Sequence, residues 1–87
     1  MFQQRPFWTD NWTVKHRAMA VYDERTGEMK FLARVALEDD KWRGYVRCMT
    51  TGISQTLTSD PLPFMFSAQQ WVMFEIQAFK EATLRAA

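Results

Sequence analysis

The sequence predicts an α+β fold in which a four-stranded antiparallel meander (ββββα order) precedes one C-terminal amphipathic helix packed on one face of the sheet. Apolar and polar residues alternate with period two between residues 11 and 58, as in antiparallel strands with one buried face. Short polar or glycine-containing segments interrupt this alternation at spacings typical of hairpins. From residue 67 the apolar period becomes that of a helix.

Each part of this fold has its own signal. Residues 1–10 contain Phe2, Phe7 and Trp8 and are expected to form an arm that docks on apolar surface of this chain or of a neighbour. The sheet occupies 11–58, where the alternation predicts strands at 12–22, 29–37, 42–50 and 53–58. The segments between them, 23–28, 38–41 and 51–52, have the polar and glycine residues of tight turns.

The C-terminal segment has the signals of a helix start. Residues 59–66 contain two prolines and form a connection, because proline cannot donate to a strand ladder. The helix is expected over 67–86, where Ser67 and Gln70 match a capping box. Apolar side chains then recur on one arc, which we expect to cover the apolar face of the sheet.

The composition favours a single folded domain, 1–87, with surface left for a partner. Apolar residues make up 47% of the 87-residue chain and aromatic residues 15%, whereas disordered chains are poor in both. So small a domain cannot readily bury this much apolar surface alone. We therefore expect an interface, either between copies in a homo-oligomer or with another protein.

Few residues suit catalysis. His16 is the only histidine, and the expected register places it under the helix near Glu75, as an acid–base pair or as a polar contact at the edge of the core. Cys48 lies on the same face, where a covered thiol is typically an unreactive packing group. Because no phosphate-binding loop, nucleophile elbow or zinc-protease motif is present, we expect no enzyme, no catalytic residue and no cofactor.

Metal, disulfide and membrane sites are also disfavoured. Cys48 is the only cysteine, so neither an intramolecular disulfide nor a cysteine zinc site can form. Asp39 and Asp40 share a turn but lack a third oxygen ligand, so no metal site is expected. Without a signal-peptide pattern or a long apolar run, the chain is expected to be cytoplasmic and to make no contact with a membrane.

The feature that points to a function is the polar face of the expected sheet. Six basic residues and one aromatic share that face, while the acids are expected in the turns and the helix. These seven residues are Lys15, Arg17, Lys30, Arg34, Arg43, Tyr45 and Arg47. Such a face can follow phosphates while Tyr45 stacks on bases. The alternative is a solvated surface, because antiparallel sheets commonly carry Lys and Arg on their wet side.

A second candidate surface is apolar. Trp8 in the arm, and Met73 and Leu84 away from the main arc of the helix, are possible anchors for a protein partner or a second copy. The alternative for the two helix residues is that they are isolated exposed apolar side chains, which are common.

These features predict a small non-enzymatic binding module. The first hypothesis is that its basic sheet face binds single-stranded nucleic acid. The second is a protein-binding adaptor or inhibitor, such as a phage or mobile-element protein that blocks a host complex. The inferred order of four strands and one helix is similar to that of PUR-repeat and Whirly-type single-strand binders, which often act as dimers or higher oligomers. This similarity concerns element order alone and transfers no residues.

Overall fold

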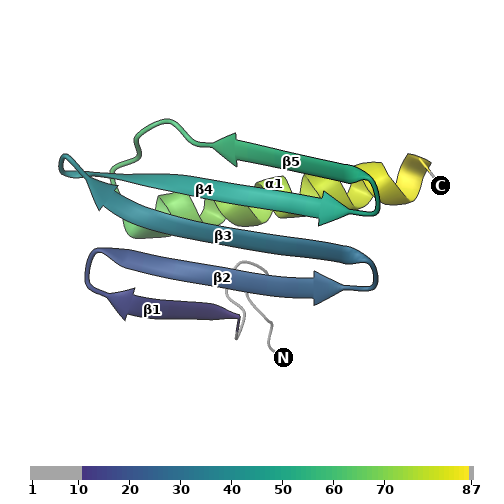
Figure 1. The fold of residues 1–87 in the computed structure, drawn as a ribbon. Helices are drawn as coiled ribbons and strands as arrows, with labels where there is room; N and C mark the ends of the chain where they lie inside the picture. The colour runs from purple at the N-terminus through teal and green to yellow at the C-terminus, as the bar shows by residue number, and fades with distance from the viewer. Residues whose placement is uncertain (1–10, 87) are drawn as a thin grey trace, which may run out of the picture.

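A computed structural model describes residues 11–86, which form one antiparallel sheet and one helix (Figure 1). The elements are β1 Trp12–His16, β2 Met19–Thr26, β3 Met29–Glu38, β4 Lys41–Thr50, β5 Ile53–Thr58 and α1 Met65–Ala86. The strands lie in the sheet in chain order, each antiparallel to the next. The α+β class, the antiparallel meander and the C-terminal helix are therefore confirmed, but the sheet has five strands rather than four.

The extra strand arises because the expected first strand, 12–22, is folded back on itself. The chain turns at Arg17 and Ala18, and the Ala18 N–H donates a hydrogen bond to His16 Nδ1 at 3.2 Å. The pairing of β1 with β2 shifts register between Val14 and His16, as at a β-bulge. The alternation of apolar and polar residues continues through this tight turn, so the sequence pattern does not show where β1 ends and β2 begins. The order is thus one strand longer than the ββββα order inferred from the sequence.

The β2–β3 and β3–β4 hairpins are tighter than expected, while the β4–β5 turn lies at residues 51–52 as predicted. Thr26 pairs with Met29, so β2 includes residues that the sequence assigned to a loop. Between β3 and β4, Asp39 and Asp40 form a two-residue turn with φ values of 51° and 68°. Two successive positive φ angles define the hairpin turn that follows the natural twist of the strands, and aspartate tolerates them better than most residues. These two acids therefore serve as turn residues.

The helix begins earlier than the capping box predicted. It starts at Met65, and the Ala68 N–H already donates to the Phe64 carbonyl at 3.2 Å. Ser67 consequently lies inside the first turn and does not cap the helix. Pro63 directly precedes this region, where the fixed φ of proline and its missing N–H are least costly to a helix.

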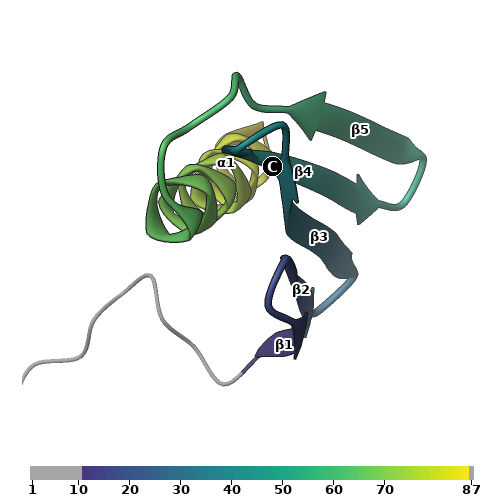
Figure 2. The same cartoon turned by 90° about the vertical axis from the view of Figure 1, so that its left-hand side faces the viewer.

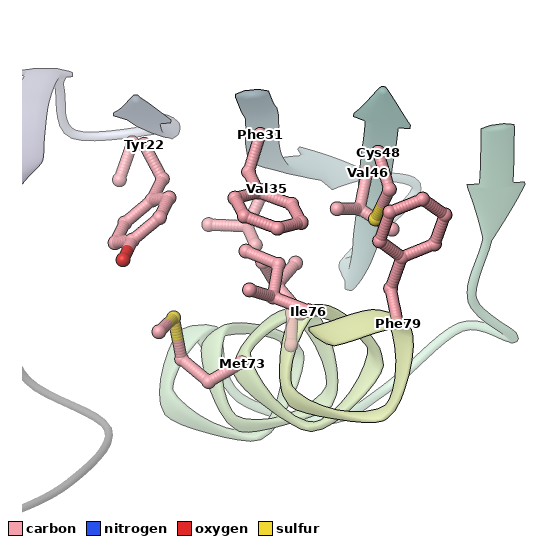
Figure 3. Close-up of a cluster of buried hydrophobic side chains, with 11 residues drawn as sticks. Tyr22, Phe31, Val35, Val46, Cys48, Met73, Ile76 and Phe79 are labelled. Carbon is pink, nitrogen blue, oxygen red and sulfur yellow. The ribbon is translucent and has the colours of Figure 1, made fainter. Parts of the chain in front are cut away.

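The helix packs on one face of the sheet, over β3 and β4 (Figure 2). Most of the core side chains that meet between the two layers are labelled in Figure 3, and Phe31 contacts Phe79 edge to face with ring centroids 5.9 Å apart. The buried cluster consists of Ala20, Tyr22, Phe31, Val35, Val46, Cys48, Ala68, Val72, Met73, Ile76 and Phe79. Within residues 11–86, the opposite face of the sheet carries no helix (Figure 2), and we call it the open face.

The connection between β5 and α1 is tied to β4. Ser59 Oγ accepts a hydrogen bond from the Gly44 N–H at 2.8 Å, and its hydroxyl donates to the Asp60 carbonyl. Further along, the backbones of Trp42 and Leu62 exchange two hydrogen bonds of 2.7 Å. These bonds bring the chain around the end of the sheet and onto the face that the helix covers.

Candidate functional site

Alternate residues of the strands form the open face, because residues directly opposite each other in an antiparallel pair share a face. The pairing places their side chains in rows across the sheet. One row contains Val21, Arg34, Tyr45 and Thr58, and the next contains Asp23, Leu32, Arg47 and Thr56. The open face is therefore one continuous surface that extends over four strands.

An open hollow of about 540 Å³ lies on this surface. Its lining includes the basic residues Lys15, Arg34 and Arg47 and the apolar residues Val21 and Leu32. Basic side chains can bind anionic groups, and an exposed apolar surface can bind flat or apolar ones. The hollow thus combines the two kinds of contact that an amphipathic anion requires.

Cations outnumber acids on the open face. The basic residues there are Lys15, Arg25, Lys30, Arg34, Lys41, Arg43 and Arg47, and the acids are Asp23 and Glu38. The expectation that the acids lie outside the strands is thus wrong for these two and for Glu24, which lies in β2. Arg25 and Lys41 were missed because the sequence assigned them to turns, and only the strand lengths place them on this face. Arg17, by contrast, lies in the turn that joins β1 and β2.

Two of the cations stand directly opposite each other. Arg25 pairs with Lys30 across the β2–β3 hairpin. Like charges in such a position destabilise an antiparallel pair. The open face therefore carries positive charge that the fold itself does not neutralise.

Tyr45 has partners that the sequence did not reveal. The Arg34 guanidinium lies over its ring, 4.0 Å from the centroid, and its hydroxyl donates to Glu38 Oε2 at 2.6 Å. This hydrogen bond raises the pKa of Tyr45 above its usual value. Tyr45 is therefore held in place rather than being a free platform, and the Arg34 guanidinium plane becomes the flat group available for stacking.

The basic residues differ in how far they are engaged. Arg43 has its Nε 3.5 Å from Glu38 Oε1 and donates to the Ser59 carbonyl at 2.9 Å, so part of its charge is already balanced. Lys15, Lys30 and Arg47 make no ion pair within residues 11–86, and the same holds for Arg25 and Lys41. These five residues are the cations of the open face best able to take an external anion.

His16 lies apart from the other residues considered for catalysis. His16 is exposed in β1 at the edge of the sheet, and α1, which carries Glu75, makes no contact with β1. The expected pair of His16 and Glu75 is thus wrong, because the turn after β1 moves that strand away from the helix.

Cys48 is fully buried beneath the helix, as the sequence indicated. Burial, assisted by the negative charge of Glu75, raises the pKa of the Cys48 thiol to about 11. The thiol is therefore protonated near neutral pH and acts as a packing group. No cluster of three or more His, Cys, Asp or Glu side chains in the described part of the chain could hold a metal ion.

The apolar candidates have different locations. Met73 is only 9% exposed and belongs to the same buried cluster as Tyr22 (Figure 3), so it is not a surface anchor. Met73 lies on the side of the helix toward β2, and it is buried because the sheet extends beyond the helix on that side. Leu84 is 69% exposed as expected, and Phe74 and Phe64 are 70% and 66% exposed. Trp8 lies outside the described residues.

Comparisons with known proteins assign no family. No protein-family model, curated protein or solved structure matches this chain. Within the described residues, no helix is long and apolar enough to cross a membrane.

Proposed function

We propose that this protein is a non-enzymatic binding module whose open sheet face binds single-stranded nucleic acid. The observation that carries the proposal is the excess of cations on the open face, seven against two acids. Three of these cations, Lys15, Arg34 and Arg47, line the hollow together with Asp23 and apolar side chains. A single strand exposes phosphates and base faces together, and known single-strand binders combine a basic groove with flat or apolar platforms. We also propose that the protein lies in the cytoplasm, a reducing compartment in which its one cysteine can stay a free thiol.

The distribution of charge supports binding through this face in particular. The whole chain has a net charge of only +1, so the cations of the open face are balanced by acids elsewhere. A polyanion is therefore attracted to one side of the molecule and repelled from others. Bulk attraction, which coats nucleic acid without orientation, is weak at this net charge.

A single strand fits the open face better than a duplex does. Sequence reading in a duplex groove requires a protruding helix or ribbon, whereas the open face is a broad sheet with a shallow hollow. The Arg34 guanidinium, which lies over the Tyr45 ring, offers a base a flat group to stack on. Lys15, Lys30 and Arg47 then supply the contacts to phosphates.

The test is fluorescence anisotropy of labelled single-stranded DNA and RNA at two salt concentrations. If Lys15, Lys30 and Arg47 each neutralise one phosphate, the logarithm of the binding constant falls against the logarithm of salt with a slope of about −2. The double variant Arg34→Glu/Arg47→Glu should abolish binding.

A matched control separates local from overall charge. Arg47→Glu and Arg85→Glu change the net charge equally, but Arg85 is exposed at the end of the helix and not on the open face. Arg47→Glu should weaken binding by about tenfold or more, which corresponds to ~1.4 kcal/mol, while Arg85→Glu leaves it almost unchanged. Equal losses for the two variants, or no binding by the wild type at low salt, would refute the proposal.

The second candidate function is a protein-binding adaptor or inhibitor, and one observation favours it. Phe64, Phe74 and Leu84 expose large apolar side chains outside the sheet, and exposed aromatics are typical anchors of protein interfaces. Such an interface tolerates salt. A photo-crosslinking residue placed at position 74 in the producing cell should capture one specific protein, whereas the same residue at position 47 should not.

A further inference from the structure

The two edges of the sheet are protected to different degrees. Edge strands usually carry charges, bulges or a short length that prevent them from pairing with another strand. At one edge, β1 has two of these features that β5 lacks, because it contains Lys15 and shifts register after Val14. At the other edge, β5 has the sequence ISQTLT, and no charged residue occurs from 48 to 59. Only the β5 edge is thus open to pairing.

The pairing of β5 with β4 shows which backbone groups remain free. Thr50 and Ile53 close a two-residue turn, and such a closing pair exchanges hydrogen bonds. The Ser59 N–H donates to the Gly44 carbonyl at 2.8 Å, so odd-numbered residues point their backbone groups at β4. Since these directions alternate, the N–H and C=O groups of the even-numbered residues point outward, and no strand within residues 11–86 pairs with them. The outward residues are Ser54, Thr56 and Thr58.

We propose that β5 of a second copy of this chain pairs with this edge, antiparallel, about a twofold axis at Thr56. In this register Thr56 faces the partner's Thr56, and Ser54 faces the partner's Thr58. Each outward N–H and C=O of the three residues then has a partner in the other strand. The facing side chains are small hydroxyl residues without charge, so pairing brings no repulsion, and threonine pairs are favourable across strands.

The geometry also decides how the two sheets join. Every outward backbone group belongs to an even-numbered residue, and the side chains of those residues all lie on the open face. Paired residues share a face, so the open faces of the two copies must lie on the same side. The product is one ten-stranded sheet with both helices on its other side and one continuous basic surface. The dimer itself does not depend on the proposed binding of nucleic acid.

Sedimentation velocity of the full chain, over a series of concentrations, measures the dimer directly. The contact is one edge strand and buries little area, so a weak, reversible dimer is expected. Thr56→Pro removes an N–H that β4 does not use, and Thr56→Lys places two like charges opposite each other. Both variants should be monomeric, while Thr56→Val, which keeps the N–H and the strand propensity, should still dimerise. Circular dichroism establishes that each variant remains folded.

Oxidative cross-linking tests the register. In the proposed dimer, Cα atoms at position 56 lie about 5.5 Å apart, within the range for a disulfide. Those at position 54 are separated by about 14 Å, because four residues of strand lie between them. Thr56→Cys should therefore form a covalent dimer and Ser54→Cys should not. A monomer at every concentration, a dimer that survives Thr56→Pro, or preferential cross-linking at position 54 would overturn the proposal, whatever the protein does with nucleic acid.

Discussion

Gly44→Ala is the substitution for which the structure makes the sharpest energetic prediction. Gly44 lies in β4, where residues of α1 approach the strand backbone closely. A Cβ at this position would lie 2.8 Å from Trp71 Cε3 and 3.3 Å from the Ala68 carbonyl oxygen. Carbon atoms attract each other best at about 3.5–4.0 Å. The added methyl group must therefore displace the Trp71 ring, or push the helix away from the sheet.

The expected cost follows from two opposing effects. Overpacking of a well-packed core destabilises a protein by about 1–3 kcal/mol. Alanine is favoured over glycine inside a strand by about 0.5–1 kcal/mol, which offsets part of that loss. We therefore expect Gly44→Ala to lower the free energy of unfolding by about 1–2 kcal/mol, which reduces the Tm by roughly 5–15 °C for a domain of this size.

Urea denaturation followed by circular dichroism measures this difference, and a double-mutant cycle assigns it to one contact. Trp71→Leu removes the ring atoms that the new methyl group would meet but keeps an apolar side chain. In that background, Gly44→Ala should be close to neutral, so the two substitutions should be coupled by about 1 kcal/mol or more. If Gly44→Ala is as stable as the wild type, or costs the same in both backgrounds, the close packing inferred at this position is wrong.

Further predictions concern three buried or partly buried polar groups. Burial raises the pKa of Glu24, but hydrogen bonds from Lys80 and two neighbouring hydroxyls outweigh that effect and hold the pKa below 4.5. The stability that the Glu24 carboxylate contributes is therefore complete above pH 4.5 and is lost as the pH falls. Glu24→Gln should make the free energy of unfolding depend less on pH in the acid range. The Cys48 thiol, with its pKa raised to about 11, should react with iodoacetamide far more slowly in the folded protein than in urea, and equal rates would contradict its burial. Its contribution to stability should be complete below the ordinary thiol pKa of 9.0 and should be lost as the pH rises from there through about 11. Ser59→Ala leaves the buried Gly44 N–H without its acceptor and should cost about 1–3 kcal/mol in urea denaturation, whereas Ser59→Thr, which keeps the hydroxyl, should cost less.

The sequence by itself determined the elements whose signals are local. Phe31 and Val35 in β3, and Val46 and Cys48 in β4, face the core as the alternation predicted. The reason is that period two places alternate side chains on one face of a strand, and a shift of one residue would expose all four. The helix was equally readable, because the spacing of its apolar residues matches the helical turn. The basic character of the open face followed from the same alternation.

Only the tertiary structure decided the features that depend on how separate elements meet. The turn after β1 left His16 exposed, and the width of the sheet beside the helix buried Met73. Arg34 and Tyr45 became partners because β3 and β4 place them directly opposite each other. Such contacts join residues that are distant in the chain, and their geometry depends on strand lengths and registers that local patterns do not specify. The unprotected edge at β5 is likewise a property of the assembled sheet, because a strand becomes an edge only through its position among the others.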